Sequence, residues 1–353
     1  MLYYILYFVV FLALLSAVSK KESVSYTLFG IAVIALILVN GLRDPFVYPD
    51  NINYYYFFEG HFDYAGEGTL GWGYVTFTKI IRFLTSYYPV YFFVIAVLII
   101  GSYAKTIKDY SPYIWVSLII FILVNYYPTF FLLRQYLVMP LFFFCVKYTI
   151  ERKLIPYMIC ILLAFTVHTT SVIIAPLYFL YGIQYSKWNM TWVAIGTVLA
   201  IGAFVLIGPL MSFVGSYYLH YFDLEQEEPA WQRAVMKVSI MVVYLFGMGK
   251  YFYKEGINRI LFYSFLFNVV ICVGAINLYG VFRLRDYFSI ADIIGIPVVL
   301  ATTKNKNTIK RILVVVAIIV YIYLLYVSCR SFIDGGNMEG FYQFFWNGHP
   351  TER

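Results

Sequence analysis

The chain has 353 residues, of which 62% are hydrophobic and only 12% are charged, and its net charge is +7. A soluble domain carries about 25% charged residues, so this composition excludes a soluble globular protein. The Lys and Arg residues lie mostly in short segments between apolar runs. Membrane topology therefore explains the positive charge better than binding to nucleic acid, and we expect no nucleic-acid partner.

Apolar runs of the length that crosses a membrane, about 20 residues, recur along the whole chain. Continuous runs favour helices over the alternating strands of a barrel. We therefore predict an all-α polytopic membrane protein with about 12 transmembrane helices in a single integral membrane domain, 1–353. The first run has no basic residue before it, so we interpret it as a retained span rather than a cleaved signal. The expected spans are about 1–18, 25–41, 88–104, 112–126, 130–147, 154–167, 170–185, 188–208, 233–250, 258–277, 286–302 and 309–328.

The basic loops indicate an orientation, because cytoplasmic loops carry an excess of Lys and Arg. Placing them inside leaves both termini outside, together with three longer segments, 42–87, 209–232 and 329–353, the last being a C-terminal tail. These outer segments hold most of the acidic residues and many aromatic ones, so we expect function on the outer face. The basic loops are Lys20–Lys21, Lys105/Lys108, Lys147/Arg152/Lys153, Lys187, Lys250/Lys254/Arg259 and Lys304/Lys306/Lys310/Arg311.

Residues 70–84 form one further apolar segment, which Lys79 and Arg82 interrupt. We interpret it as an interfacial or re-entrant helix on the outer face. Counting it as a full crossing would place Lys105 and Lys108 outside and invert everything downstream. The alternative is therefore a true span with the first two helices reoriented.

Two clusters of polar residues follow apolar runs in the first half of the chain. Arg43, Asp50 and Tyr54 come just after the second span, where Pro45 and Pro49 are expected to prevent a regular helix. A solvated loop with a snorkelling arginine is the alternative to a binding site. Arg134–Gln135 lies inside an apolar run, and a buried guanidinium needs an anionic partner because it does not deprotonate. That partner is either a protein carboxylate or a phosphate.

Two more clusters lie further along. His168 is at the tip of a short hairpin and is either a hydrogen-bonded core residue or a proton acceptor. Arg283 and Arg285 stand at the expected outer start of a helix, followed by Asp286 and Tyr287. They either hold an anion between them or pair locally with the aspartate.

The remaining chemistry-bearing residues indicate no cofactor. The four cysteines are scattered, and we expect them to be small buried side chains. Cys and His do not show zinc spacing, and no glycine-rich phosphate loop is present. The acidic run at 223–228 suits either calcium or magnesium or, as the simpler alternative, a solvated loop.

Together the clusters suit a diphosphate with sugars attached. Arginines neutralise a diphosphate leaving group, a base accepts the proton of an attacking hydroxyl, and aromatic rings pack on sugar rings.

These motifs resemble the EpsG-like branch of the Wzy-type polysaccharide polymerases. The chain departs from the family pattern in two places: it has Gly71–Trp72–Gly73–Tyr74 where the family often has E-P-G-[YF], and Val167 in place of Phe before the histidine. The acidic residue of that pattern is either missing here or replaced by Glu67, so the role of the family carboxylate has no assigned residue in this chain. The matching residues, in family order, are Gly41–Leu42–Arg43, Asp50, Tyr54, Arg134–Gln135, His168, Ser171, Arg283, Tyr287 and Phe288.

The resemblance implies a GT-C-like, metal-independent membrane glycosyltransferase without a cofactor. It would move a growing glycan from undecaprenyl diphosphate to the non-reducing-end hydroxyl of a new lipid-linked repeat unit, at the outer face of the bacterial cytoplasmic membrane. The product would be a capsule, O-antigen or exopolysaccharide. The partners are the lipid-linked donor and acceptor, membrane lipid and, as a further candidate, a chain-length regulator.

Site roles follow from the resemblance and the chemistry together. His168 is the first candidate for the base and Asp50 the second. The expected substrate-binding residues are Arg43, Tyr54, Arg134, Gln135, Arg283, Arg285 and Tyr287.

The rival functions are a flippase of lipid-linked oligosaccharides and an O-antigen-ligase-type glycosyltransferase. A flippase should show cationic residues along a central path and two related halves. A ligase usually has a much larger outer loop.

Overall fold

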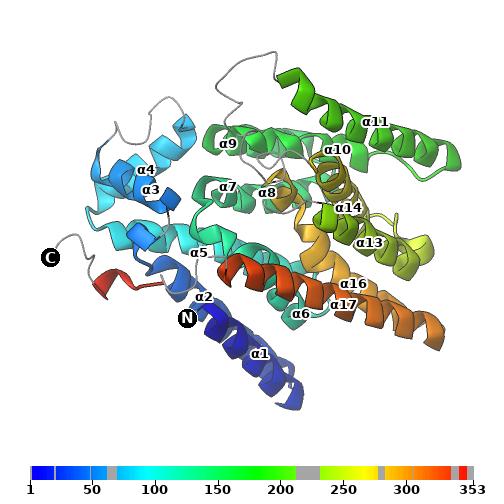
Figure 1. Cartoon of the computed structure of the whole chain (residues 1–353), viewed down its shortest axis with the longest axis horizontal. Coiled ribbons are helices and arrows are strands. Elements are labelled where there is room, and N and C mark those ends of the chain that lie inside the picture. The colour runs from blue at the N-terminus through cyan, green and yellow to red at the C-terminus, as the bar shows by residue number, and fades with distance from the viewer. Residues whose placement is uncertain are drawn as a thin grey trace. The chain divides into compact units, whose positions relative to one another are not determined.

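The computed structural model describes residues 2–19, 21–47, 49–61, 70–211, 231–276, 283–304, 306–334 and 342–347 (Figure 1). Within these ranges every regular element is a helix, and one isolated bridge joins Arg43 to Phe344. The chain groups into two compact units. Unit 1 comprises Met1–Lys147, Ile155–Val172 and Tyr323–Arg353, and unit 2 comprises Tyr148–Leu154 and Ile173–Ile322.

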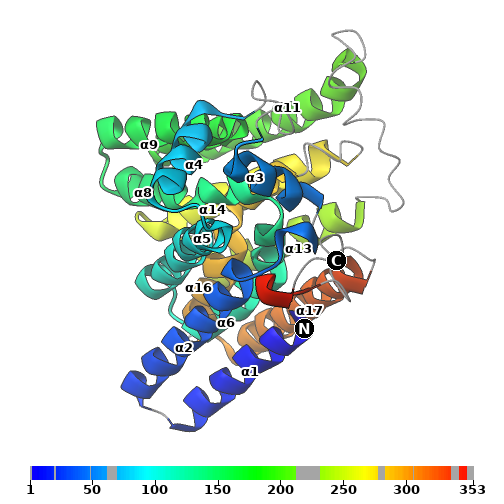
Figure 2. The ribbon, with the colours of Figure 1, turned by 90° about the vertical axis from the view of Figure 1, so that its left-hand side faces the viewer.

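Unit 1 is built around α2, which packs against both α1 and α5 (Figures 1 and 2). The chain between α6 and α8 is broken into short pieces, and α9 belongs to this unit for most of its length. The elements are α1 (Leu2–Ser19), α2 (Glu22–Gly41), η1 (Pro45–Val47), α3 (Pro49–Glu59), α4 (Trp72–Leu84), α5 (Tyr88–Tyr110), α6 (Ile114–Phe121), the π-helical η4 (Ile122–Tyr126), η5 (Pro128–Phe130), α7 (Leu133–Leu137), α8 (Met139–Ile150) and α9 (Leu154–Val167).

Unit 2 is built around α14, which packs against α11, α13, α10 and the short helices η8 and η9. Helix α17 begins in unit 2 and ends in unit 1. Helix η6 (Thr169–Ile174) begins in unit 1 and ends in unit 2. The other elements are α10 (Pro176–Tyr181), α11 (Lys187–Met211), α13 (Trp231–Met248), η7 (Gly249–Tyr251), α14 (Ile257–Gly274), η8 (Arg283–Phe288), the π-helical η9 (Ala291–Gly295), α16 (Ile296–Thr303) and α17 (Thr308–Phe332).

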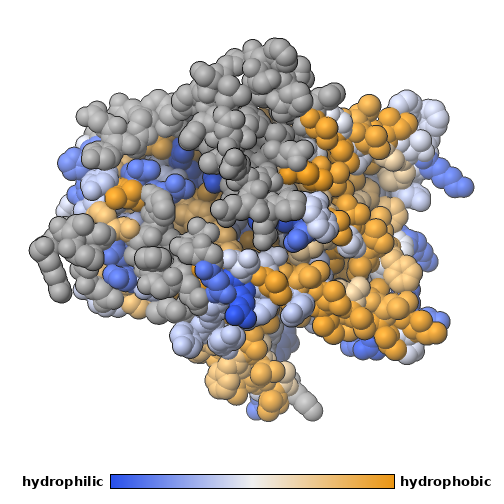
Figure 3. All heavy atoms as spheres, viewed as in Figure 1, coloured by the Kyte–Doolittle hydropathy of each residue, from blue (hydrophilic) through white to orange (hydrophobic). Residues whose placement is uncertain are grey.

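Five described helices are long and apolar enough to cross a membrane: Glu22–Gly41, Tyr88–Tyr110, Trp231–Tyr251, Ile257–Gly274 and Thr308–Phe332. Each of the other expected spans coincides with a described helix or a run of short helices, and none of these is among the five found in the described residues. The structure therefore confirms an all-helical membrane protein without confirming twelve crossings. Apolar residues such as Ile312, Val316 and Ile319 of α17 are exposed, and Figure 3 shows hydrophobic atoms where α13 and α17 lie. This surface suits contact with lipid.

Helix α4 has 13 residues, a length of about 20 Å, which is well short of the roughly 30 Å hydrocarbon core. Its buried residues Tyr74, Thr78 and Ile81 follow helical spacing, while Trp72 and Phe83 are exposed. One apolar face on protein and a second apolar face flanked by basic residues are typical of a helix in the membrane interface. The helix is thus too short for a straight crossing, and the interfacial interpretation of residues 70–84 stays a prediction.

The expectation that Pro45 and Pro49 prevent a regular helix is wrong. Pro49 is the first residue of α3, an α-helix of 11 residues. Proline suits this position because its fixed φ matches the helix and the N–H that it lacks would have no helical partner. Pro45 likewise opens the 3₁₀ helix η1. Both prolines start helical turns rather than disrupt them, and α3 carries two candidate residues, Asp50 and Tyr54.

Candidate active site

Arg134 and Tyr54 come together in unit 1. Tyr54 is buried on α3, and Arg134, half-buried on α7, donates from Nε to its hydroxyl at 3.4 Å. The Tyr54 ring packs edge-on against Tyr74 of α4, with 5.6 Å between the centroids. Asp50 lies one turn before Tyr54 on α3 and is exposed. Helix α3 therefore supplies the phenol of Tyr54 and the carboxylate of Asp50, and α7 supplies the guanidinium of Arg134. Helix α4 packs against this group through Tyr74.

The phenol of Tyr54 is a hydrogen-bond donor rather than a base. Burial raises the pKa of Tyr54, although the neighbouring Arg134 opposes the rise and Asp50 adds to it. A raised pKa keeps the phenol neutral at physiological pH. The hydroxyl can thus accept a hydrogen bond from Arg134 and donate its own proton to an anion held beside the guanidinium.

The start of α4 packs tightly against the end of α9, as the ribbons in Figures 1 and 2 show. A Cβ atom at Gly71 would overlap with the backbone carbonyl of Thr166, and one at Gly73 would overlap with the Thr166 side chain. Positions 71 and 73 must therefore both be glycine for α4 to approach α9 this closely. This contact brings Tyr74 and the segment that carries His168 to the same end of unit 1.

His168 follows the last residue of α9 and is half-buried. Its backbone N–H donates to Ala164 O at 2.9 Å, and Thr170 Oγ1 lies 2.9 Å from the ring Nδ1. When Nδ1–H donates to Thr170, the lone pair of the ring lies on Nε2, which is the arrangement that a base needs. The chain on either side of His168 is helical, as α9 before it and as η6 and α10 after it.

We expect Gly73→Ala to destabilise the protein by about 1–3 kcal/mol, as inserting a methyl group into a packed contact does. The matched control is Gly101→Ala on α5, where a Cβ would meet no atom within 4 Å. Alanine in an exposed helix interior is more favourable than glycine by up to about 1 kcal/mol, so this control should match or exceed wild type. Thermal unfolding in detergent measures both. Equal unfolding midpoints for the two variants would contradict the close approach of α4 to α9.

Arg43 and Gln135 are buried, and Arg43 is only 1% exposed. Arg43 bonds the Asn40 side chain at 3.0 Å, and its guanidinium lies 4.8 Å from the Phe92 ring and 5.5 Å from the Phe130 ring. Its guanidinium therefore sits among α2, α5 and η5 in the interior of unit 1.

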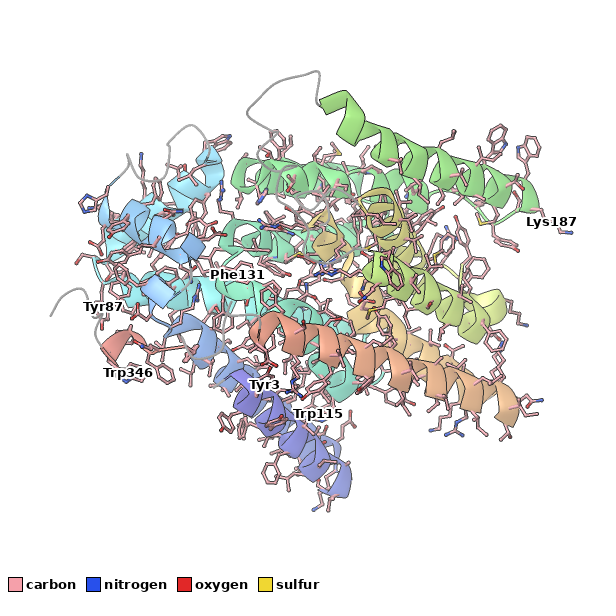
Figure 4. All side chains as sticks on the ribbon, viewed as in Figure 1. Tyr3, Tyr87, Trp115, Phe131, Lys187 and Trp346 are labelled. Atoms are coloured by element: carbon pink, nitrogen blue, oxygen red, sulfur yellow. The ribbon has the colours of Figure 1, made fainter. Side chains whose placement is uncertain are left out.

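The C-terminal segment 342–347 runs back over Arg43. Asp44 N–H donates to Gln343 O at 2.8 Å and Phe345 N–H donates to Leu42 O at 3.1 Å. The Phe345 ring also packs edge-on against Tyr87, and Figure 4 shows Tyr87 and Trp346 at the same end of the molecule. Sequence alone does not indicate this pairing, because it joins residues about 300 positions apart.

In unit 2, Arg283 is exposed and Arg285 is half-buried on η8. Arg285 Nε lies 3.4 Å from Asp286 Oδ1, which is the local pairing considered from the sequence. Tyr287 is fully buried. The two arginines are thus at the surface of unit 2 and the tyrosine is in its core.

Unit 2 also contains a buried charged residue that the sequence analysis did not single out. Lys237 lies in the middle of α13 and pairs with Asp292 of η9. A lone lysine at the centre of a spanning helix costs about 2.5–3.5 kcal/mol, and this cost is the feature of the sequence that could have indicated Lys237. A cavity of about 760 Å³ lies elsewhere in unit 2, between α11 and α14, and its lining contains none of the candidate residues.

Among the described residues, no group of three or more His, Cys, Asp and Glu is placed to hold a metal ion. The acidic run at 223–228 lies outside the described residues, as does Glu67. All four cysteines are buried and free, as expected, and the Cys145 and Cys160 side chains hydrogen-bond each other.

The apolar helices define an integral membrane protein. The model of the EpsG family matches residues 26–345, nearly the whole chain. The chain therefore belongs to the EpsG family, a Wzy-like polymerase family, and is a polysaccharide polymerase-like membrane protein, which confirms the resemblance seen in its motifs. No curated protein and no solved structure matches the chain.

Proposed function

We propose that this protein polymerises lipid-linked repeat units at the outer face of the bacterial cytoplasmic membrane, with both termini outside. The donor is a growing glycan on undecaprenyl diphosphate, and the acceptor is the non-reducing-end hydroxyl of a new lipid-linked unit. The observation that carries the proposal is the pairing of Arg134 with Tyr54 in a cluster to which α4 also joins the His168 segment. Family membership supports the polymer class.

In the proposed step, the acceptor hydroxyl oxygen forms a bond to the anomeric carbon of the donor sugar. The bond between that carbon and the diphosphate oxygen breaks, and its electron pair leaves with undecaprenyl diphosphate. The hydroxyl proton passes to Nε2 of His168, with Nδ1–H held by Thr170. No nucleotide sugar is consumed, because the donor already carries a diphosphate leaving group.

Arg134 is proposed to stabilise the charge that develops on the departing diphosphate. Its half-buried position, with Nε on Tyr54, leaves the guanidinium held in one orientation. A preorganised cation beside a developing negative charge is typically worth a factor of 10² to 10³ in rate. Arginine side chains thus provide the charge stabilisation that a divalent ion supplies in other transferases, so we propose a metal-independent reaction.

Arg43 and Gln135 are proposed to support this cluster from the interior of unit 1 rather than to contact sugar, because both are buried. Arg43 joins the end of α2 to η5, and the short helix that carries Arg134 follows η5 in the chain. Asp50 is exposed beside Tyr54 and is the second candidate for the base. Arg283 and Arg285 are proposed as diphosphate-binding residues of unit 2, where the buried Tyr287 anchors their segment.

Deletion of the gene in the native host, followed by gel analysis of the surface glycan, tests this function against its rivals. We expect the ladder of long chains to disappear while a single repeat unit still reaches the surface. Complete polymer that is not attached to its final carrier would indicate a ligase. Loss of every unit from the outer face would indicate a flippase. Either of the last two results would overturn the proposed polymerase activity.

A further inference from the structure

Three side chains from distant parts of the sequence form a closed polar group inside unit 2. Lys237 of α13 bonds Asp292 Oδ2, and it also donates to the Tyr321 hydroxyl of α17 at 3.0 Å. Tyr321 in turn donates to Asp292 Oδ1 at 2.7 Å. The three residues are 6%, 1% and 4% exposed, respectively. Both carboxylate oxygens are therefore satisfied, and the ammonium is held by two partners within a group of membrane helices.

Stability alone does not explain why such a group is retained. A buried ion pair loses so much hydration that well-packed apolar residues of similar size are often as stable or more stable. Ionisable residues within membrane helices are costly and usually serve function. None of the three side chains is at the surface of unit 2, so the group can act only through the segments that it holds together.

The segment that this group holds is irregular. Asp292 lies in the π-helical turn Ala291–Gly295, which follows the 3₁₀ helix Arg283–Phe288. Single π-helical turns are rare and are frequent at functional sites. The same segment is held at its centre by α14, because Asn268 Nδ2 donates to Phe288 O at 3.2 Å and the Phe267 ring stacks on Phe288 at 4.3 Å.

Arg283 and Arg285 lie in the first turn of this segment. They belong to a stretch that lacks the continuous hydrogen bonds of an α-helix, so their direction depends on the points at which the stretch is anchored. Asp292 anchors the C-terminal part of the segment, and Lys237 and Tyr321 hold that anchor from α13 and α17.

We propose that Lys237, Asp292 and Tyr321 form a positioning triad that fixes the segment 283–295 and thereby sets the affinity of Arg283 and Arg285 for the substrate diphosphate. This inference rests on the proposed function for its substrate, but not for the effect on the segment itself. The triad residues contact no substrate and act through the segment.

The test replaces the whole ion pair with apolar residues, in the variant Lys237→Met/Asp292→Leu. Single replacements leave one buried charge unpaired and should lower the unfolding midpoint, whereas the double variant should recover it. In the recovered variant, hydrogen exchange of the backbone at 283–295 should be faster than in wild type. The KM for the lipid-linked substrate should rise about 10- to 100-fold with a smaller change in kcat. The single variant Lys237→Arg, which keeps the charge, should retain most of the wild-type affinity for the lipid-linked substrate.

The matched control makes the same change in an exposed ion pair, Lys105→Met/Asp109→Leu, in which the charged atoms are 2.6 Å apart. We expect it to alter neither exchange at 283–295 nor KM. A folded Lys237→Met/Asp292→Leu variant with wild-type exchange at 283–295 overturns the triad. Faster exchange at 283–295 in Lys237→Met/Asp292→Leu supports the triad. If KM is nevertheless unchanged in this variant and in Arg283→Ala/Arg285→Ala, the assignment of the two arginines to the diphosphate is overturned.

Discussion

Arg134→Ala should lower kcat/KM for polymerisation about 10²- to 10³-fold, because it removes the guanidinium proposed to meet the charge on the departing diphosphate. Arg134→Lys should recover only part of this loss. The ammonium keeps the charge but cannot both donate to Tyr54 and offer a planar fork to phosphate. The assay follows chain elongation of a lipid-linked repeat unit by purified protein, and unfolding midpoints establish that each variant is folded.

Two further variants separate a diphosphate-binding role from a general effect of charge. Arg311→Ala removes an exposed guanidinium from the start of α17 and should leave elongation unchanged. Tyr54→Phe removes only the hydroxyl that accepts from Arg134, and we expect a loss of a few-fold, about the value of one hydrogen bond. Long glycan made at the wild-type rate by Arg134→Ala would contradict the role assigned to this residue.

His168→Ala should lower kcat about 10²- to 10⁴-fold, the range expected when a positioned base is removed. The matched control is His61→Ala, which removes another imidazole, whose ring lies 5.9 Å from that of Tyr56. This control should be close to wild type. Chain length on a gel and initial rates of elongation measure both variants.

The hydrogen bond to His168 offers a finer test of the same role. Thr170→Val removes the hydroxyl 2.9 Å from Nδ1, while Thr169→Val changes its exposed neighbour on the same 3₁₀ helix. A base that Thr170 orients should lose activity in the first variant and keep it in the second. Near-normal polymer in His168→Ala would instead transfer the assignment to Asp50, and Asp50→Asn should then abolish elongation.

The membrane class and the positions of the long helices follow from composition and continuous apolar runs. Chain breaks were harder to predict. The expected span 112–126 ends in the π-helical turn Ile122–Tyr126, and the expected span 130–147 is divided between α7 and α8. Hydrophobicity reports burial but not backbone hydrogen bonding, so an apolar run conceals such breaks. One of them sets Arg134 on a five-residue helix rather than within a span.

Candidate site residues could be predicted where the chemistry of the side chain itself was unusual for its position. They could not be predicted where their role depends on a contact with a residue distant in the sequence. Arg134, Tyr54 and His168 stood out because a charged or titratable group beside an apolar run needs an explanation. Glycine is required at positions 71 and 73 because of the contact with Thr166, which lies about 90 residues further along the chain. Arg43 looked like a loop residue because its covering segment, 342–347, is at the other end of the chain. Lys237 was overlooked because its partner Asp292 is 55 residues further on.

The central claim is that a sugar chain moves from one lipid diphosphate to another at a cluster built on Arg134. Purified protein in proteoliposomes, supplied only with a lipid-diphosphate-linked repeat unit, tests it most directly. We predict elongated glycan with one undecaprenyl diphosphate released for each new glycosidic bond, and almost none of either product with Arg134→Ala. Elongation that requires a nucleotide sugar, or that proceeds without release of the lipid diphosphate, would contradict this mechanism.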